Sequence, residues 1–231
     1  MEAIILAGGK AERLGDAAGG RPKALVEVAG KPLAAYQVGR LASAGVTRVI
    51  FACAAGEGAQ FVDELAGLGP EIVAAEEQER LGRGGGIKFA ARERTERGEV
   101  LALNGDELVD VDFGALLAAH REGGALATIT VARPKSQFGL VQLDDDDLVV
   151  GFEEAGRVPY WVNCGNYVLT EEAIARFPDR GDHESSTFPE LAAAGELRAY
   201  RHEGLWLTVN TPKELRVAQD HVESHPEWLA T

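Results

Sequence analysis

The sequence predicts an α/β fold built on one doubly wound, mostly parallel β-sheet. Apolar runs of strand length alternate with stretches of helix length through residues 1–131, which is the order that βαβ units produce. The run at 47–53 has a continuous apolar centre, as expected for a strand buried in a parallel sheet. At 231 residues and 45% hydrophobic content, the chain can bury the core that such a sheet needs.

Strands and helices alternate regularly in this first part. The helix expected from residue 32 has Pro32 in its first turn and ends at Gly45, where glycine suits the C-cap. Another helix is expected directly after a cluster of glycines. The expected strands are 3–7, 47–53, 71–75, 100–103 and 125–131, and the expected helices are 32–44, 57–66, 87–97 and 112–121.

The pattern changes near Arg133 and Pro134. Residues 139–168 contain short apolar runs separated by turns, and we interpret them as a β-rich insertion that covers one side of the site. The four aspartates at 144–147 are expected to cap a solvated hairpin, because the spacing of a calcium loop is absent. The remaining expected elements are a helix at 188–194, strands at 197–202 and 205–209, and a closing helix at 211–222.

Composition narrows the classes of partner. A net charge of −14 argues against nucleic acid and against an anionic membrane surface, because both need a basic face. The chain has no apolar run of 18 residues and no signal-peptide pattern, so we expect a soluble cytoplasmic protein. Cys53 and Cys164 are far apart and form no C-x-x-C motif, which disfavours a disulfide or a zinc site.

Residues 4–28 carry the first functional signal. An expected strand is followed at once by Gly8 and Gly9, which let the backbone approach a ligand and expose its N–H groups. A strand, a glycine turn and fixed cations suit a polyphosphate. Such turns are also common in α/β proteins, and neither a dinucleotide fingerprint nor a P-loop is present. The cations of this stretch are Lys10, Arg13, Arg21 and Lys23.

Two further segments support the same interpretation. Asn104-Gly105-Asp106 follows a strand at the carboxyl edge of the predicted sheet, where an aspartate can hold Mg²⁺. The alternative for this segment is an ordinary Asn-Gly turn. The segment LGRGGGIK at 81–88 precedes a helix, and its glycines would let a flat base or a phosphate lie on the backbone. The alternative there is an unusually flexible loop.

In their order along nearly the whole chain, these motifs resemble those of the sugar-1-phosphate nucleotidylyltransferases. The opening motif appears as LAGGKAERL and RPKAL, the second loop as LGRGGGIK and the metal motif as LNGD. FGLV at 138–141, GFEE at 151–154 and NCGNY at 163–167 resemble the segments of the sugar pocket, and WLTVNTP at 206–212 resembles the closing motif.

The resemblance implies a single nucleotidyltransferase domain over residues 1–231. A Rossmann-like nucleotide-binding core would span 1–134. A sugar-binding subdomain would span 135–205, and a closing strand and helix would span 206–231. The family reaction joins a nucleoside triphosphate to a sugar-1-phosphate, uses Mg²⁺ and releases pyrophosphate.

The resemblance also assigns roles to single residues. Arg13 would grip the β- and γ-phosphates, Lys23 would steady the α-phosphate, and Asp106 with Asn210 would hold Mg²⁺. The attacking group is itself an anionic phosphate, so no general base is expected. The implied nucleotide-binding residues are Leu6, Ala7, Gly8, Gly9, Glu77, Gly82, Asn104 and Gly105. The implied sugar-phosphate-binding residues are Gly139, Glu154, Asn163, Gly165 and Arg157.

The sequence departs from the family pattern in three places. Thr208 stands where many members have an aspartate, and threonine is a poor metal ligand, so Asn210 is expected to be the second ligand. Ala155 stands where the family has the lysine that grips the sugar phosphate. Arg157, Lys88 or another cation would have to replace that lysine.

The third departure is Arg83, which replaces a common threonine and either contacts phosphate or faces solvent. The choice of base rests on Glu77, which stands where uridylyl and thymidylyl enzymes typically have glutamine. A carboxylate only accepts hydrogen bonds, which suits the N1–H and N2–H₂ donors of guanine. Gln78 is adjacent, and a shift of one residue would restore the pyrimidine alternative.

The favoured hypothesis is an Mg²⁺-dependent enzyme that uses GTP with mannose- or heptose-1-phosphate. A second hypothesis is UTP or dTTP with glucose-1-phosphate or an N-acetylated sugar phosphate. A third is a relative with a non-sugar acceptor such as phosphocholine, and a fourth is a nucleotide-binding sensor without catalysis. The sequence does not distinguish a monomer from a homodimer, and it does not identify the sugar, the base or the pathway.

Overall fold

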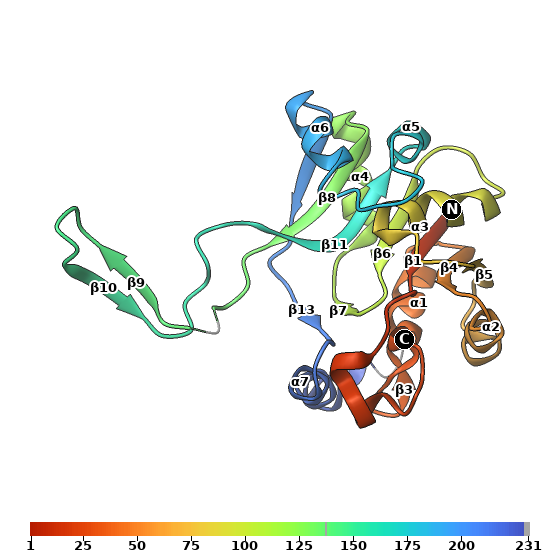
Figure 1. The fold of residues 1–231 in the computed structure, drawn as a ribbon, viewed down its shortest axis with the longest axis horizontal. Helices are drawn as coiled ribbons and strands as arrows, with labels where there is room; N and C mark the ends of the chain where they lie inside the picture. Colours follow the sequence, from red (N-terminus) through yellow and green to blue (C-terminus); the bar gives the residue numbers. More distant parts are fainter. Residues whose placement is uncertain (137, 229–231) are drawn as a thin grey trace.

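The computed structural model describes residues 1–136 and 138–228. Its central sheet contains β1 (Glu2–Leu6), β4 (Arg48–Ala54), β5 (Glu71–Glu77), β6 (Val100–Asn104), β8 (Ala127–Ala132), β11 (Val162–Leu169) and β12 (Leu197–Arg201). The strand order is β12-β8-β11-β6-β1-β4-β5 (Figure 1). Neighbours pair in parallel except around β11, which is antiparallel to β6 and to β8. The predicted α/β fold with a mostly parallel sheet is confirmed.

Helices cover both faces of this sheet, because the pleat sends successive side chains of a strand to opposite sides. In β1, Ala3 and Ile5 belong to one buried cluster and Ile4 belongs to another. The first cluster is covered by α1 (Leu33–Ser43), α2 (Gly58–Leu65) and α4 (Phe113–Gly123). The second is covered by α3 (Gly82–Ala90), α5 (Glu171–Ala175) and α6 (Thr187–Ala193). Within the described residues, no helix is long and apolar enough to cross a membrane.

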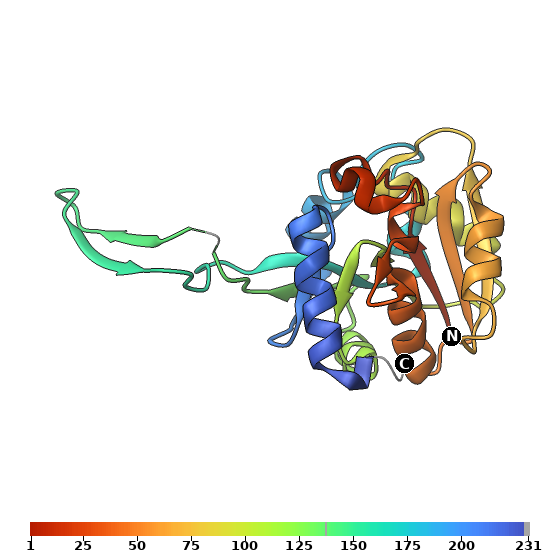
Figure 2. The same cartoon turned by 90° about the horizontal axis from the view of Figure 1, so that it is seen from below.

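A third buried cluster joins the two ends of the chain beside the sheet. It contains Leu14 from η1 (Glu12–Ala18) and Leu215 from α7 (Pro212–Ser224). Two small antiparallel pairs contribute to it: β2 (Glu27–Val28) with β3 (Lys31–Pro32), and β7 (Glu107–Val109) with β13 (Trp206–Thr208). Figure 2 shows α7 beside the opening segment of the chain. This packing holds the C-terminal helix next to the predicted phosphate-binding stretch.

Two of the expected segments fold differently by more than frayed ends, and α5, β7 and the β2–β3 pair were not expected. Helix α3 begins at Gly82, because the expected glycine loop forms its first turn, and it ends at Ala90 before a short 3₁₀ turn, η3 (Ala91–Glu93). The segment expected as one β-rich insertion is divided. Residues 140–153 form a hairpin of β9 (Leu140–Leu143) and β10 (Val149–Glu153) that projects from the body (Figures 1 and 2), whereas β11 enters the main sheet.

The tip of the projecting hairpin has the structure that its aspartates predict. The Asp144 Oδ1 atom accepts hydrogen bonds from the N–H groups of Asp146 and Leu148, at 3.0 and 2.9 Å. Asp147 has a φ of 63°, a left-handed conformation that aspartate tolerates better than most residues. The acidic run therefore forms the solvent-exposed turn that connects β9 to β10.

Candidate active site

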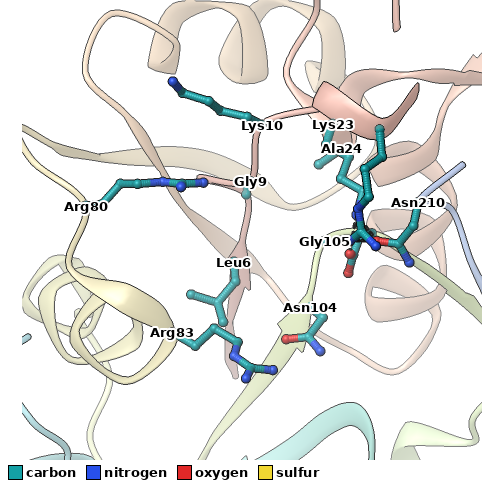
Figure 3. Close-up of a pocket in the computed structure, with 13 residues that line it drawn as sticks. Leu6, Gly9, Lys10, Lys23, Ala24, Arg80, Arg83, Asn104, Gly105 and Asn210 are labelled. Carbon is teal, nitrogen blue, oxygen red and sulfur yellow. Dashed lines mark hydrogen bonds and ion pairs between the residues drawn. The ribbon is translucent and has the colours of Figure 1, made fainter. Parts of the chain in front are cut away.

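A cavity of about 310 Å³ opens at the carboxyl ends of β1 and β6 (Figure 3), the edge at which open α/β sheets bind ligands. It brings five basic side chains to one carboxylate, which suits a polyanionic ligand. Most of the lining comes from the first 24 residues and from the end of β6. The lining residues are Leu6, Ala7, Gly9, Lys10, Arg13, Lys23, Ala24, Arg80, Arg83, Asn104, Gly105, Asp106 and Asn210.

Gly105 allows the two strand ends to meet. Its N–H donates to the carbonyl oxygen of Leu6 at 2.9 Å. A Cβ atom at this position would lie 2.5 Å from that oxygen and 3.2 Å from the Cβ of Ala24, so a larger residue would push β1 and β6 apart. The Asn-Gly-Asp segment is therefore a close backbone approach that sets Asp106 in the cavity wall.

Four predicted site residues converge on one side of the cavity. The Lys23 Nζ atom lies 2.5 Å from Asp106 Oδ2 and also donates to Asn210 Oδ1. Arg13 Nη2 donates to the same Asn210 oxygen at 3.2 Å. Lys23 is only 8% exposed, so Asp106 rather than water compensates most of its charge. The fold thus joins the residues that the resemblance assigned to phosphate binding and to metal binding.

The C-terminal segment positions Asn210 through backbone contacts. The N–H of Val209 donates to the carbonyl of Asp106 at 2.8 Å, which continues the pairing of β13 with β7. The Asn210 N–H donates to Glu214 Oε2 at 2.8 Å, and the Glu214 N–H donates to the Thr211 hydroxyl at the N-cap of α7. This variant of a capping box fixes the loop before α7, and with it the side chain of Asn210.

The donor set at this point fits a hard divalent cation. The Asp106 carboxylate and the Asn210 carbonyl oxygen are ligand types that Mg²⁺ prefers, and the Lys23 ammonium already reaches both. The Thr208 hydroxyl donates instead to Glu214 at 3.3 Å. In the described part of the chain, no three His, Cys, Asp or Glu side chains form a metal cluster. The protein would therefore supply two oxygens, and phosphate and water would fill the other positions.

Glu107 lies behind Asp106 and is only 5% exposed. Burial, followed by the charge of Asp106, raises the pKa of Glu107 well above its ordinary value, which favours the neutral acid and avoids a second buried negative charge. Its Oε1 accepts from Asn104 Nδ2 at 3.2 Å, and Gln37 donates to the backbone carbonyls of both residues. These contacts hold the loop that carries Asp106.

A bulge in β11 brings the predicted sugar-pocket motif beside the metal motif. The register between β11 and β8 shifts between Asn163 and Tyr167, and Gly165 has a φ of 65°. A Cβ at Gly165 would collide with Asn104 Nδ2 and would lie 2.7 Å from Glu107 Oε1. Bulges of this kind often occur next to active sites, and here the glycine allows two strands to meet at the cavity.

Arg83 connects the cavity to the sugar-pocket motif. It donates through Nε to Asp182 Oδ2 at 2.8 Å, and its Nη1 lies 2.8 Å from Glu184 Oε2. Burial lowers the pKa of Arg83. The hydrogen bond to Asp182 and the charge of Glu184 together raise it by more than burial lowers it, so the pKa lies above its ordinary value. Glu184 Oε1 also accepts from Asn163 Nδ2 and the Tyr167 hydroxyl, at 2.9 and 3.0 Å. One carboxylate thus bridges the two parts of the predicted site.

The glycines of the second motif serve helix packing. A Cβ at Gly82 would lie 2.5 Å from the carbonyl oxygen of Gly181, and one at Gly85 would lie 2.6 Å from that of Asp179. The N–H groups of Gly84 and Gly85 donate to the Gly181 carbonyl, so these helix-terminal donors are already paired. The nucleotide role of Gly82 stays a prediction, while its φ of 79° explains why glycine stands there.

Several predicted residues lie outside the cavity lining. Gly8 faces the carbonyl of Ala52, and Glu77 lines an adjacent cavity of about 430 Å³. Gly139 and Glu154 lie at the base of the projecting hairpin. Arg157 donates there to the carbonyl of Arg133 at 2.7 Å. Their predicted roles require the acceptor to lie between the cavity and that base.

Three residues of the site were not recognised from the sequence. Arg80 lines the cavity. It could have been found from the sequence, because it is a cation directly before the glycine-rich segment. Asp182 and Glu184 hold Arg83 from about one hundred positions along the chain. No local pattern marks such a distant ion pair, so these two carboxylates could be found only in the folded protein.

The chain matches the model of the nucleotidyl transferase family over residues 2–225, and it belongs to that family. Among similar proteins, it is 33% identical to the mannose-1-phosphate guanylyltransferase of Mycobacterium tuberculosis, over 93% of this chain and 62% of that protein. It is 30% identical to the mannose-1-phosphate guanyltransferase beta-A of Xenopus laevis, over 99% of this chain and 68% of that protein. The chain thus spans 62–68% of the length of these relatives.

Solved structures agree on the fold. HddC from Yersinia pseudotuberculosis matches with a TM-score of 0.75 at 24% identity, over 95% of this chain and 98% of that one. The same protein complexed with GMP-PN matches with a TM-score of 0.72 at 22% identity and the same coverage. At these identities the likeness shows a shared fold, and the family assignment rests on the sequence matches.

Proposed function

We propose that the protein transfers a nucleoside monophosphate from a nucleoside triphosphate to a sugar-1-phosphate and releases pyrophosphate. The observation that carries the proposal is the convergence of Arg13, Lys23, Asp106 and Asn210 on one cationic cavity. The family membership and the names of the relatives support the same reaction. Mg²⁺ is the proposed cofactor, with Asp106 and Asn210 as its protein ligands.

In this reaction an oxygen of the acceptor phosphate forms a bond to the α-phosphorus, and the bond from that phosphorus to the bridging β-oxygen breaks. The nucleophile is already anionic and the leaving group is pyrophosphate, so positioning and charge neutralisation account for most of the catalysis. In the proposed reaction Lys23 steadies the α-phosphate, and Arg13 binds the β- and γ-phosphates. Bound Mg²⁺ would supply further neutralisation of the phosphate charge.

GTP is the proposed nucleotide, and Glu77 is the proposed reader of the base. A Cβ on Gly86 would lie 2.6 Å from Glu77 Oε1 and 3.1 Å from Leu6 Cδ2, so the carboxylate lies close to a residue of the phosphate cavity. Glu77 Oε2 accepts from the Leu81 N–H at 3.1 Å. Burial raises the pKa of Glu77, and a desolvated carboxyl gains more from donors such as N1–H and N2–H₂ of guanine.

Mannose- or heptose-1-phosphate is the proposed acceptor. The names of the relatives favour mannose-1-phosphate, and Asn163 supplies a polar side chain in the segment that Gly165 allows to lie beside the metal motif. Lys88 is an unpromising replacement for the missing lysine, because it is paired with the Phe177 carbonyl and with Asp179, at 2.8 and 2.9 Å. Arg157 remains the proposed cation, which places the acceptor phosphate near the base of the projecting hairpin.

Pyrophosphate release measured with each nucleoside triphosphate against several sugar-1-phosphates tests the proposal. We expect turnover with GTP and a mannose- or heptose-type acceptor. No turnover with any pair would overturn the proposed reaction, whereas a clear preference for UTP or dTTP would overturn only the guanine assignment. Glu77→Gln should reduce the preference for GTP about tenfold, the effect of one lost hydrogen bond to the base. Gln78→Ala is the matched control and should leave the preference unchanged.

A further inference from the structure

The projecting hairpin, residues 140–153, has one apolar face and one polar face. Paired residues of an antiparallel ladder share a face, and the pairs Val141–Phe152 and Leu143–Val149 lie on the same one. The opposite face is mostly polar: Gln142 pairs with Gly151 and Leu140 with Glu153, and the Gln142 side chain lies over the glycine. We call this hairpin the arm, and the four large side chains of its first face the apolar stripe.

The described residues of the body do not cover this stripe. Val141 is 50% exposed, Leu143 55%, Val149 56% and Phe152 67%. Figures 1 and 2, which are turned by 90° from each other, both show the arm extending away from the sheet and its helices. An isolated two-stranded hairpin is marginally stable in water, and alternation of apolar and polar residues is the pattern of a strand with one covered face. We therefore expect another molecule to cover the apolar stripe of the arm.

Charge is distributed along the arm in a way that suits one particular partner. The tip carries four aspartates, 144–147. The base carries the cations Arg133, Lys135 and Arg157 and the carboxylates Glu153 and Glu154. A backbone β-bridge joins Lys135 to Arg157, and Arg157 donates to the Arg133 carbonyl. The tip is therefore strongly acidic, whereas cations outnumber carboxylates at the base, although the whole chain has a net charge of −14.

We propose that the arm is a dimerisation element whose partner is the arm of a second copy of this chain. A twofold axis would place the two apolar stripes face to face and antiparallel. The pair Val141–Phe152 of one copy would then pack against the pair Leu143–Val149 of the other. In that arrangement each acidic tip lies against the basic base of the partner arm. A parallel arrangement would bring the two acidic tips together and is disfavoured by like-charge repulsion.

This pairing has a consequence for the active site. Glu154 and Arg157, the predicted acceptor-binding residues, lie at the base of the arm next to the proposed interface. The tip of a partner arm would therefore approach the mouth of the acceptor site. The inference itself is independent of the proposed function, because the stripe and the charge distribution stand without any assignment of substrate.

Sedimentation velocity over a dilution series tests the proposal on the intact chain. We expect a reversible dimer, and Phe152→Glu should raise its dissociation constant at least about a hundredfold, because it places a charge within the apolar stripe. Gln142→Glu, on the polar face of the same arm, is the matched control and should leave the constant nearly unchanged. Circular dichroism should show that both variants keep the native fold.

A charge-swap series tests the antiparallel arrangement. Asp145→Lys alone and Lys135→Glu alone should each weaken the dimer, and the two together in one chain should restore it, since tip and base of opposite copies would again be complementary. A protein that stays monomeric at all concentrations, or a dimer that is insensitive to Phe152→Glu, would overturn the proposal. A dimer that the double variant fails to restore would overturn the antiparallel arrangement.

Discussion

The phosphate cavity and the arm are both made of short strands and turns, but they are stabilised in opposite ways. At the cavity, segments from the beginning, middle and end of the chain are joined through Asp106, Lys23 and Asn210. In the arm, two strands pair only with each other, and the apolar stripe faces outward. The cavity holds charges in fixed positions, as phosphoryl transfer requires, whereas the arm offers a surface that another molecule must complete.

The largest effect is expected where the cavity depends on one carboxylate. Asp106→Ala should lower Mg²⁺-dependent turnover by about a thousandfold, because it removes the charged protein ligand and leaves Lys23 without its counter-ion. Pyrophosphate release under saturating nucleotide measures the loss. Asp145→Ala at the tip of the arm is the control and should keep most of the turnover. Equal losses in both variants would erase the functional difference between the two regions.

A matched pair of phenylalanines compares the stability that the two regions contribute. Phe51 is fully buried and stacks on Phe61 at 4.8 Å, whereas Phe152 is 67% exposed. Phe51→Ala should lower the free energy of unfolding by about 3–5 kcal/mol. Phe152→Ala should change it by less than about 0.5 kcal/mol at protein concentrations that keep the chain monomeric. Urea unfolding measures both, and a large loss for Phe152→Ala in the monomer would mean that the body covers the arm.

His183, which stands between Asp182 and Glu184, should make the stability of the fold sensitive to acid. It is fully buried, stacks on Phe177 at 4.7 Å, and burial lowers its pKa from 6.5 to about 4. Asp182 raises the pKa of this imidazole and Arg83 lowers it, but both effects are smaller than that of burial. Because the folded state binds the proton more weakly, stability from this group is present above pH 6.5 and lost as the pH falls towards 4.

The expected loss from this histidine between pH 7 and pH 5 is about 2 kcal/mol of unfolding free energy. His183→Phe should flatten the pH dependence by that amount, since a neutral ring would keep the stacking. Urea titrations of both proteins at the two pH values measure the difference. An identical pH dependence in the variant would show that the imidazole is hydrated or paired in solution.

The smallest effect concerns the metal ligands before any nucleotide binds. The Lys23 ammonium reaches both predicted ligands, so it competes with a divalent cation for them. Lys23→Met should raise the affinity for Mn²⁺ in the absence of nucleotide about tenfold, as measured by the electron paramagnetic resonance of free Mn²⁺. Lys10→Met is the control, because Lys10 lines the same cavity but its ion-pair partner among residues 1–136 and 138–228 is Glu12, at 3.9 Å, and not a predicted metal ligand. No gain for Lys23→Met would mean that the metal does not use these two oxygens.

Much of the fold and part of the site could be predicted from the sequence. Local patterns predicted the strand that ends before Gly8, the Asn-Gly-Asp segment after β6 and the acidic hairpin turn. The length of an apolar run indicates a strand, and glycine and aspartate indicate the turn that follows it, all within a few residues. The alternation of strands and helices predicted the parallel sheet for the same reason. The ordered motifs led to the family that the comparison with known proteins confirmed.

The tertiary structure decided the features that depend on distant contacts. The pairing of β7 with β13 brings Asn210 to Asp106, and the ion pairs of Arg83 join α3 to Asp182 and Glu184. Gly82 and Gly85 were predicted to form a ligand-binding loop, and only the folded structure shows that they make room for the segment that packs on α3. Residues 139–168 looked like one insertion, yet they divide between an arm in solvent and a central strand. A local pattern specifies which face of an element is apolar, but only long-range packing determines what covers that face.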